Sequence, residues 1–269
     1  MKRFLFSILI ISILLMSCED TIKADLDTAD PRLVIDAGIT WVKGTSGSEQ
    51  VIKLSTTTGY YDTEIPVVSG ATVYMTNGEE QVFDFVETPG TGNYVCNNFI
   101  PVIGEEYRLT VIADGITYEA TERMISVPEI SSVEQNEEGG FLGDEKEVKF
   151  YYQDDPEADN YYLTRFDVSF LATSEYDVSD DSFTQGNRMF ENFSHEDMKT
   201  GDVVNIRFSG ISERFYNYMS LVIDASDGNS FSVPAANIRG NIRNQADEQD
   251  YPYGFFRLSQ AEIISVTIE

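Results

Sequence analysis

The sequence is short of the residues that most enzymes use for chemistry. Its 269 residues include one histidine, two cysteines and one tryptophan, and its 18 lysines and arginines are outnumbered by 46 aspartates and glutamates. The formal net charge of −28 argues against nucleic acid as a partner, because such binding relies on Lys and Arg to neutralise phosphates. Anionic lipid headgroups are poor candidates for the same reason. The negative charge is compatible with calcium binding, with cationic ligands or simply with high solubility, so it does not identify a partner.

Long apolar runs are also scarce, and the clearest one lies at the N-terminus. Two basic residues precede the stretch from Phe4 to Met16, which is the pattern of an export signal and is shorter than the roughly 20 residues that cross a bilayer. The stretch ends in Leu15-Met16-Ser17-Cys18, which resembles the lipobox of bacterial lipoproteins. We therefore expect residues 1–17 to be a cleaved lipoprotein signal peptide and Cys18 to carry the lipid.

Lipidation of Cys18 determines what the neighbouring sequence and the second cysteine do. One acyl chain binds membranes only marginally, so the several chains of a lipoprotein cysteine, such as palmitate, make the attachment practically permanent. Residues 18–30 are polar and are expected to form a lipidated tether. Cys96 is then left without a partner and is expected to be a small core residue. The alternative is an ordinary secretory signal, with Cys18 buried or in a disulfide with Cys96.

Beyond the tether, short runs of alternating apolar and polar residues dominate, with turn residues roughly every eight to twelve positions. This pattern predicts an all-β fold of two consecutive β-sandwich domains. The first, at 31–127, is transthyretin-like or Ig-like, and its strongest hairpin signal is Asn77-Gly78, which supplies the positive φ angles of a type I′ turn. The second, at 128–269, resembles a fibronectin III-like sandwich.

The second domain also carries the best helix signal in the chain. Apolar residues recur at helical spacing near 211–223, and Ser212 is a plausible N-cap. The segment 173–201 is acidic and weakly patterned, and we expect it to be a long loop that includes at most a short helix.

His195 is the sole histidine and the sharpest catalytic candidate. Ser194 and Asp197 are close to it in sequence, but the fold brings triad members together, so adjacency is not evidence for a triad. We therefore predict no catalytic residues, no cofactor and a solvated loop around His195.

Metal ligands are also sparse. With Cys18 lipidated, one cysteine and one histidine are too few for a typical zinc site. The acidic segments 154–160, 177–181 and 247–250 supply oxygens for calcium but lack the EF-hand order. We expect solvated acidic turns there and predict no metal site.

Aromatic residues crowd the segment "YPYGFF" near the C-terminus. Aromatic side chains on a rigid sandwich can stack carbohydrate or peptide ligands, so we predict ligand binding at Tyr251, Tyr253 and Phe255. The alternative is that one residue of each adjacent pair faces the core. The sequence has one tryptophan, Trp41, which makes a carbohydrate ligand the weaker of the two choices.

Several segments occur in a definite order from Cys18 almost to Glu269, namely "CEDTIKADLDTADPRLVIDAGIT", "PVVSGATVYMTNGEE", "GNYV", "GEEYRLTVIADGITYEATERMISVPEISSV", "DDPEADNYYL", "ISERFYNYM" and "IRGNIRN…GFFRLSQAEIISVTI". In series they resemble the uncharacterised Bacteroidetes lipoprotein family called domain of unknown function 4249. The strongest part of this resemblance is the pair of segments Gly240-Asn241-Ile242 and Gly254-Phe255-Phe256. This chain departs from the family in having "NQADEQDYPY" between them, where a tighter glycine turn is common.

The resemblance implies an outer-membrane lipoprotein that is often encoded beside a TonB-dependent transporter. It brings no known activity and no catalytic residues. Glu19 and Asp20 also look like the acidic signals that send such lipoproteins to the cell surface.

The combined expectation is a non-enzymatic binding or accessory protein that is lipid-anchored to the outer membrane at Cys18 and associated with TonB-dependent nutrient uptake. Its partners would be the membrane, a TonB-dependent transporter and a small-molecule, glycan or peptide ligand, with no nucleic acid. One alternative is a structural or adhesive surface protein of fimbria-like type. A third hypothesis is an acid-based hydrolase, which needs two carboxylates facing each other across a groove.

Overall fold

The computed structural model describes residues 30–226 and 238–269, so the predicted signal peptide and Cys18 lie outside the described residues. The chain divides into two units, and of the smaller one the structure describes Asp30 and the turn Gly59–Asp62. In this turn the Gly59 amide donates to Oδ2 of Asp62 at 2.8 Å. The larger unit, Pro31–Thr58 and Thr63–Glu269, holds all the described strands.

The larger unit is built almost entirely from β-strands, which confirms the all-β prediction. The strands are β1 (Leu33–Val42), β2 (Gln50–Thr56), β3 (Thr72–Asn77), β4 (Val82–Thr88), β5 (Asn93–Cys96), β6 (Glu106–Ala113), β7 (Ile116–Ile125), β8 (Ile130–Gly139), β9 (Glu145–Gln153), β10 (Tyr161–Asp167), β11 (Glu175–Asp180), β12 (Arg188–Ser194), β13 (Val203–Ile211), β14 (Arg243–Asn244) and β15 (Tyr253–Thr267). The helix is α2 (Glu213–Ser226). Among the described residues, no helix has the length and apolarity needed to cross a membrane.

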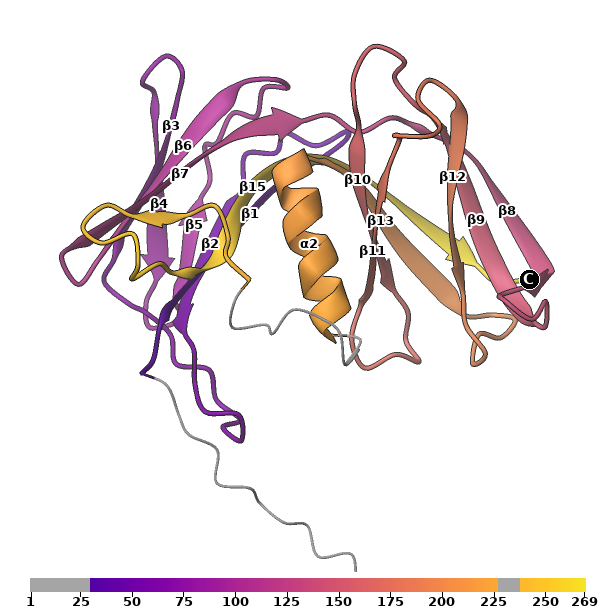
Figure 1. Cartoon of the computed structure of the whole chain (residues 1–269), viewed down its shortest axis with the longest axis horizontal. Coiled ribbons are helices and arrows are strands. Elements are labelled where there is room, and N and C mark those ends of the chain that lie inside the picture. Colours follow the sequence, from indigo (N-terminus) through magenta and orange to yellow (C-terminus); the bar gives the residue numbers. More distant parts are fainter. Residues whose placement is uncertain (1–29, 227–237) are drawn as a thin grey trace, which may run out of the picture. The chain divides into compact units, whose positions relative to one another are not determined.

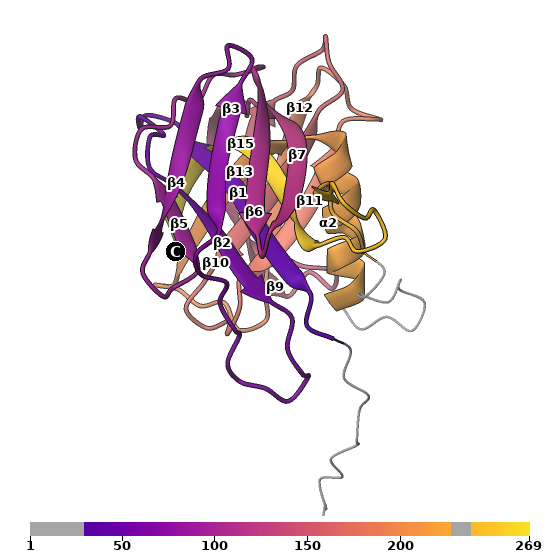
Figure 2. The same cartoon turned by 90° about the vertical axis from the view of Figure 1, so that its left-hand side faces the viewer.

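The long strand β15 pairs with three others and ties the sheet together (Figure 1). Its first half runs parallel to β1, ending with Val42 opposite Ala261, and its second half runs antiparallel to β13. At Leu258 and Ser259 it also pairs in parallel with β7. The strands β15-β1-β2-β5-β4-β3-β6-β7 therefore form a ring that closes on itself. Figure 2 shows β4, β3, β6 and β7 side by side in this ring.

This topology differs from the two consecutive sandwiches that we expected. In the described part of the chain, one twelve-stranded sheet contains the ring and extends through β13, β10 and β11, while a separate three-stranded sheet has the order β12-β9-β8. The strands within 31–127 do not complete their own sheet, because β15 from the C-terminal end of the sequence lies between β1 and β7. Local alternation cannot reveal this, since parallel pairing between such distant strands leaves no short-range pattern.

The inside of the ring is the larger of the two main hydrophobic cores. Strand alternation places Ile52 and Leu54 of β2 inward, and aromatic rings fill the centre, with Phe99 at 5.1 Å from both Phe83 and Tyr107. Cys96 is 1% exposed, and within the described residues it is a free cysteine. Its placement agrees with the prediction of a small core residue.

The second core lies between the three-stranded sheet and the strands β10, β13 and β15. Phe208 of β13 packs against Phe150 and Tyr152 of β9, with ring centroids at 5.1 and 4.5 Å. Phe166 of β10 stacks on Phe193 of β12 at 4.9 Å. These contacts join the two sheets face to face.

The expectation of a long loop at 173–201 is wrong, because this segment contains β11 and β12. In β12 the inward positions include Glu191 as well as Phe193, so the apolar alternation is interrupted by a charged residue. Oε1 of Glu191 accepts the hydroxyls of Ser179 at 2.6 Å and Tyr152 at 2.8 Å. A buried polar network therefore hides the strand pattern in the sequence.

One hairpin tests the turn prediction at Asn77-Gly78, and a second hairpin contains a type I′ turn elsewhere. The hairpin from β3 to β4 does not have the expected type I′ turn: the Asn77 amide donates to the carbonyl of Gln81, Oδ1 of Asn77 accepts the Gln81 amide at 2.9 Å, and the positive φ falls on Glu80. The Asn side chain bonds to its own turn and so selects a longer loop. Between β6 and β7, Asp114 and Gly115 have φ angles of 49° and 79°, as a type I′ turn requires.

The helix α2 begins where the sequence predicts. Oγ of Ser212 accepts the amide of Phe215 at 3.3 Å, which is the N-cap hydrogen bond. The buried Phe215 side chain packs in a small third core with Leu163, Ile211 and Phe255. This core holds α2 against β10, β13 and β15.

Candidate functional site

His195 lies just after β12. Its Nδ1 accepts the amide of Asp197 at 3.0 Å, and its ring lies 5.2 Å from the ring of Phe170. These are contacts that stabilise a loop. Across residues 30–226 and 238–269, no group of three or more His, Cys, Asp and Glu side chains is placed to hold a metal ion.

Two of the acidic segments contain buried carboxylates and are not simply solvated turns. Asp154 is 1% exposed and accepts the hydroxyl of Tyr162 at 2.7 Å and the amide of Gly186 at 2.8 Å. Asp181 is also buried and accepts the amide of Asn160 at 3.0 Å. Burial is the largest cause of a raised pKa at Asp181. The expectation of solvated turns is therefore wrong for these two residues, whose hydrogen bonds serve the fold.

The three predicted ligand-binding aromatic residues lie in two different surroundings. Tyr251 and Tyr253 meet edge to face at 5.9 Å, and the guanidinium of Arg32 lies 4.5 Å from the Tyr251 ring. Arg239 lies 3.9 Å from the same ring, so Tyr251 is already in contact with two cations. Phe255 is 6% exposed and packs against α2, where a ligand cannot stack on it. The structure therefore brings Tyr251 and Tyr253 together and separates Phe255 from them.

The segment 238–245 lies beside Tyr251 and alternates between buried and exposed residues. Ile238 and Ile242 are buried, whereas Arg239 and Arg243 are exposed. This is the alternation of an extended strand. It places both arginines on the outer side of the segment.

A pair of glycines and one asparagine fix this segment against β15. Nδ2 of Asn241 donates to the carbonyl of Phe256 at 2.7 Å, and the Phe256 amide donates to Oδ1 of Asn241 at 2.9 Å. The Asn241 side chain thus makes the two backbone hydrogen bonds that a neighbouring strand would otherwise make with Phe256. A Cβ on Gly240 would lie 1.7 Å from the carbonyl oxygen of Gly254, and a Cβ on Gly254, whose φ is +97°, would lie 2.1 Å from that of Ile35. Both positions therefore require glycine.

The loop 244–253 is held by Asn244. This buried side chain accepts the amides of Ala246 and Asp247 through Oδ1 and donates to the carbonyl of Asp250 at 2.9 Å through Nδ2. The Asn244 side chain thus closes this loop on itself.

Two cavities lie against this segment and share Arg243, and we call them together the arginine groove. The larger has a volume of about 380 Å³, and the residues lining it include Glu106, Glu119, Thr121, Arg214, Asn241 and Arg243. The smaller, of about 260 Å³, is lined by Arg239, Gly240, Ile242, Arg243, Glu248 and Tyr251. The lining comes from β6, β7, β14, α2 and the extended segment, so several rigid elements set its geometry.

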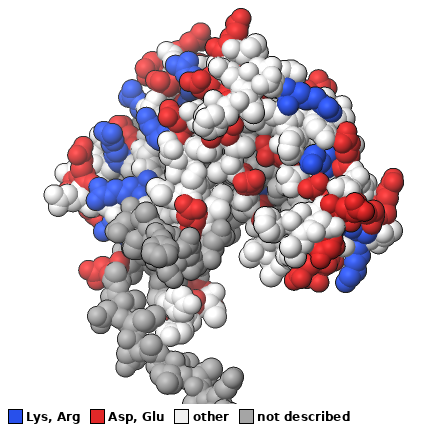
Figure 3. Space-filling view, turned by 45° about the vertical axis from the view of Figure 1, so that its right-hand side comes forward, with Lys and Arg blue, Asp and Glu red and all other residues white. Residues whose placement is uncertain are grey.

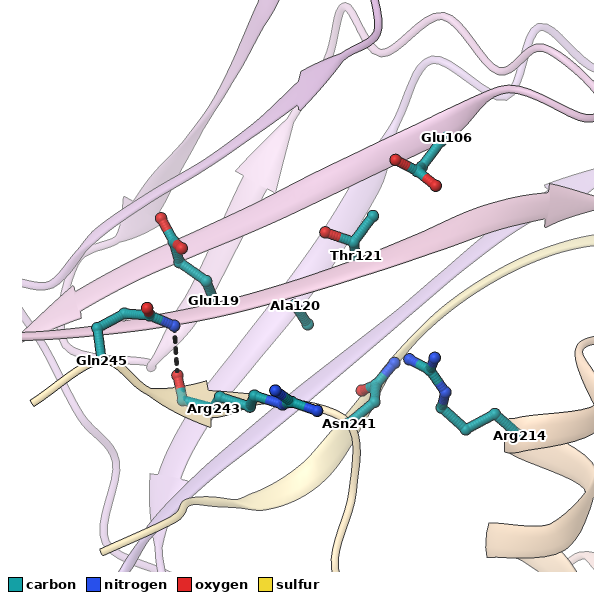
Figure 4. Close-up of a pocket in the computed structure, with 8 residues that line it drawn as sticks. All are labelled: Glu106, Glu119, Ala120, Thr121, Arg214, Asn241, Arg243 and Gln245. Carbon is teal, nitrogen blue, oxygen red and sulfur yellow. Dashed lines mark hydrogen bonds between the residues drawn. The ribbon is translucent and has the colours of Figure 1, made fainter. Parts of the chain in front are cut away.

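The charges of the larger cavity are not neutralised by close partners. In Figure 4 the guanidinium groups of Arg214 and Arg243 point toward one another, with the side chain of Asn241 between them. In the described part of the chain, neither guanidinium forms an ion pair within 4.0 Å. Burial is the largest influence on the pKa of Glu122 and raises it. The positive charge of Arg214 acts in the opposite direction and lowers it. Glu122 is thus near enough to interact with Arg214, although the two form no ion pair within 4.0 Å.

The groove brings basic residues together on a strongly acidic chain. On the face drawn in Figure 3, Asp and Glu are widespread, whereas Lys and Arg gather mainly at the left of the view. The sequence has only 18 basic residues, and three of them line the groove. Three glutamates, Glu106, Glu119 and Glu248, line the groove as well, so it presents charges of both signs and suits a ligand with charged groups.

A comparison with family models identifies the relationship that the motifs suggested. The model described as Domain of unknown function (DUF4249) matches residues 19–263. The chain belongs to the DUF4249 family. The matched range includes the two glycines and Asn241 that fix the arginine groove.

Other comparisons add no function to this DUF4249 chain. No match is found among curated proteins. A two-domain fibronectin type III segment of chicken tenascin is similar at 9% identity and a TM-score of 0.22, over 67% of this chain and 90% of that one. Domains FN1–FN3 of chicken CNTN1 are similar at 13% identity and a TM-score of 0.21, over 61% of this chain and 56% of that one. Likeness at these scores does not inform the site.

Sequence reasoning misses the arginines of this DUF4249 chain as site residues. A signal for two of them is present in "IRGNIRN", where Arg239 and Arg243 alternate with two isoleucines in a chain with few basic residues. Arg214 carries no such signal, because α2 reaches the groove only through the fold.

Proposed function

We propose that this chain is a non-enzymatic binding or accessory protein, held at the outer membrane through lipid on Cys18 and working beside a TonB-dependent transporter in nutrient uptake. The observation that carries the proposal is the arginine groove, a cavity in which neither Arg214 nor Arg243 forms an ion pair within 4.0 Å to any described residue, so that both can meet a ligand. The lipobox supports the anchor, and the acidic Glu19 and Asp20 support display at the cell surface. Membership of DUF4249 supports a Bacteroidetes lipoprotein.

The carboxylates of the groove support binding over acid-based hydrolysis. Glu119 stands opposite Thr110 in the ladder of β6 and β7, four positions from Glu106. The two Cα atoms are therefore about 14 Å apart along the strands. The two glutamates lie along one wall of the cavity, on the adjacent strands β6 and β7, whereas a hydrolytic pair needs two carboxylates that face each other across a groove.

The anchor can be tested by fractionating cells that express the Cys18→Ser variant. We expect wild-type protein in the membrane fraction and the variant in the soluble fraction, because serine cannot form the thioether that carries the lipid. Cys96→Ser is the matched control and should stay with the membrane. If Cys18→Ser remained membrane-bound, the lipid anchor would be wrong.

The partnership can be tested by cross-linking the lipidated protein in its own envelope and identifying what it captures. We expect a TonB-dependent transporter among the cross-linked products, and we expect a deletion strain to take up at least one nutrient more slowly. A deletion strain that loses adhesion but grows normally on every nutrient tested would support the structural or adhesive alternative instead.

A further inference from the structure

The larger cavity of the arginine groove combines charges of both signs that do not neutralise each other. Arg243 stands directly opposite Glu119 in the ladder of β14 and β7. Neighbours in this position commonly form a cross-strand ion pair. Within residues 30–226 and 238–269, however, neither side chain forms an ion pair within 4.0 Å. Figure 4 shows the Arg243 guanidinium directed toward Arg214 and Asn241.

Two guanidinium groups that face one another repel unless an anion lies near both. Arg214 comes from α2 and Arg243 from β14, and the Asn241 amide between them is held by its two hydrogen bonds to Phe256. A carboxylate placed there could accept hydrogen bonds from both guanidinium groups, which is the geometry that arginine favours. This end of the cavity therefore suits a singly charged carboxylate.

The opposite wall presents the carboxylates of Glu119 and Glu106. These groups repel a multiply charged anion such as phosphate and attract an ammonium group. A ligand that carries both charges satisfies both walls of the cavity. The volume of about 380 Å³ lies near the lower end of the range for small-molecule sites, so the ligand is small.

We infer that the larger cavity binds a zwitterion, namely an amino acid or short peptide, with its carboxylate at Arg214 and Arg243 and its ammonium group at Glu119. The adjoining cavity of about 260 Å³ shares Arg243 and extends the site toward Tyr251, where a side chain of the peptide fits. The inference rests on the proposed function, because it names the class of nutrient that the protein captures.

Isothermal titration of the full-length lipidated protein in detergent tests the inference. The probes are L-alanyl-L-alanine, its N-acetyl derivative, its C-terminal amide and sodium phosphate. We expect the dipeptide to bind and each capped form to bind at least about tenfold more weakly, because each loses one charged contact. Phosphate should not compete with the dipeptide.

Variants assign the two ends of the ligand. Arg214→Gln and Arg243→Gln should each weaken dipeptide binding about tenfold, and Glu119→Gln should weaken the dipeptide but not its N-acetyl derivative. Arg188→Gln, an exposed arginine on β12, is the matched control and should bind as wild type. Thermal unfolding of each variant checks that the fold is intact.

Three results would overturn the inference: no binding of the dipeptide at up to about 10 mM, equal binding of the N-acetyl form or phosphate, or wild-type affinity in both arginine variants. The second result would show a simple anion site. Each is distinguishable from failure of the proposed function, because membrane attachment through Cys18 and cross-linking to a transporter are measured separately.

Discussion

Replacing Gly254 with alanine should destabilise the fold by about 3 kcal/mol or more, the largest stability effect that we predict. Gly254 has a φ of +97°, and an added Cβ would lie 2.1 Å from the carbonyl oxygen of Ile35, an atom of the paired strand β1. The backbone cannot move away without disturbing the β1–β15 pairing. Since β15 closes the ring, the damage should spread beyond the site of the change.

Chemical denaturation monitored by tryptophan fluorescence and circular dichroism measures this effect. Gly115→Ala is the matched control: its φ is +79°, but nothing lies within 4 Å of its added Cβ. The control should lose only about 1 kcal/mol, from backbone strain. Equal losses in the two variants would show that strain alone acts at Gly254, and that its close approach to Ile35 is not what requires glycine.

Replacing Glu191 with alanine should cost about 2 to 4 kcal/mol. Oε1 of Glu191 accepts two hydroxyl groups, those of Tyr152 and Ser179, inside the second core. Tyr152 is fully buried, so its hydroxyl would lose its partner in a place where water cannot easily replace it. Glu134→Ala is the matched control, because Glu134 accepts the hydroxyl of the half-buried Tyr151 in a solvent-exposed hydrogen bond, and its loss should cost less than about 0.5 kcal/mol.

Glu191→Gln should separate the hydrogen bonds from the charge. An amide oxygen can accept both hydroxyls, so this variant should keep most of the stability that the alanine variant loses. Burial, the largest cause, raises the pKa of Glu191 in the folded state. The stabilising contribution of the protonated acid is therefore full below the unfolded pKa of about 4.3 and is lost as pH rises through the folded pKa.

The glutamine variant does not titrate and should gain stability relative to wild type between about pH 4 and pH 7. Urea denaturation of both proteins across this range measures the difference. A constant difference would show that Glu191 titrates alike in the folded and unfolded states.

Local patterns in the sequence predict the strands and the helix better than they predict how the strands join. The N-cap at Ser212 and the type I′ turn at Asp114-Gly115 depend on neighbouring residues, and both form as the residue types indicate. The closed ring depends on β15 pairing with β1 and β7, which no local pattern records. The strand β12 is hidden for another reason, because Glu191 occupies an inward position.

In the site, too, features that depend on neighbouring residues are visible in the sequence, and features that depend on the fold are not. The aromatic cluster at Tyr251 and Tyr253 is visible in the sequence, although its rings turn out to contact arginines. Glycine and asparagine in "GNI" and glycine in "GFF" are visible in the sequence, but their role in fixing an extended segment needs the distances to Phe256 and Ile35. Arg214 joins the groove from a helix that sequence spacing cannot position.

We propose that the arginine groove captures a ligand for uptake. Native mass spectrometry of the full-length protein, released from its own envelope in mild detergent, tests it most directly. We predict that wild-type protein carries a small molecule with both an amine and a carboxylate, and that the Arg214→Gln/Arg243→Gln double variant, folded and equally abundant, carries none. A double variant that retains the same molecule at the same occupancy, or a wild-type protein with no bound molecule, would contradict the account.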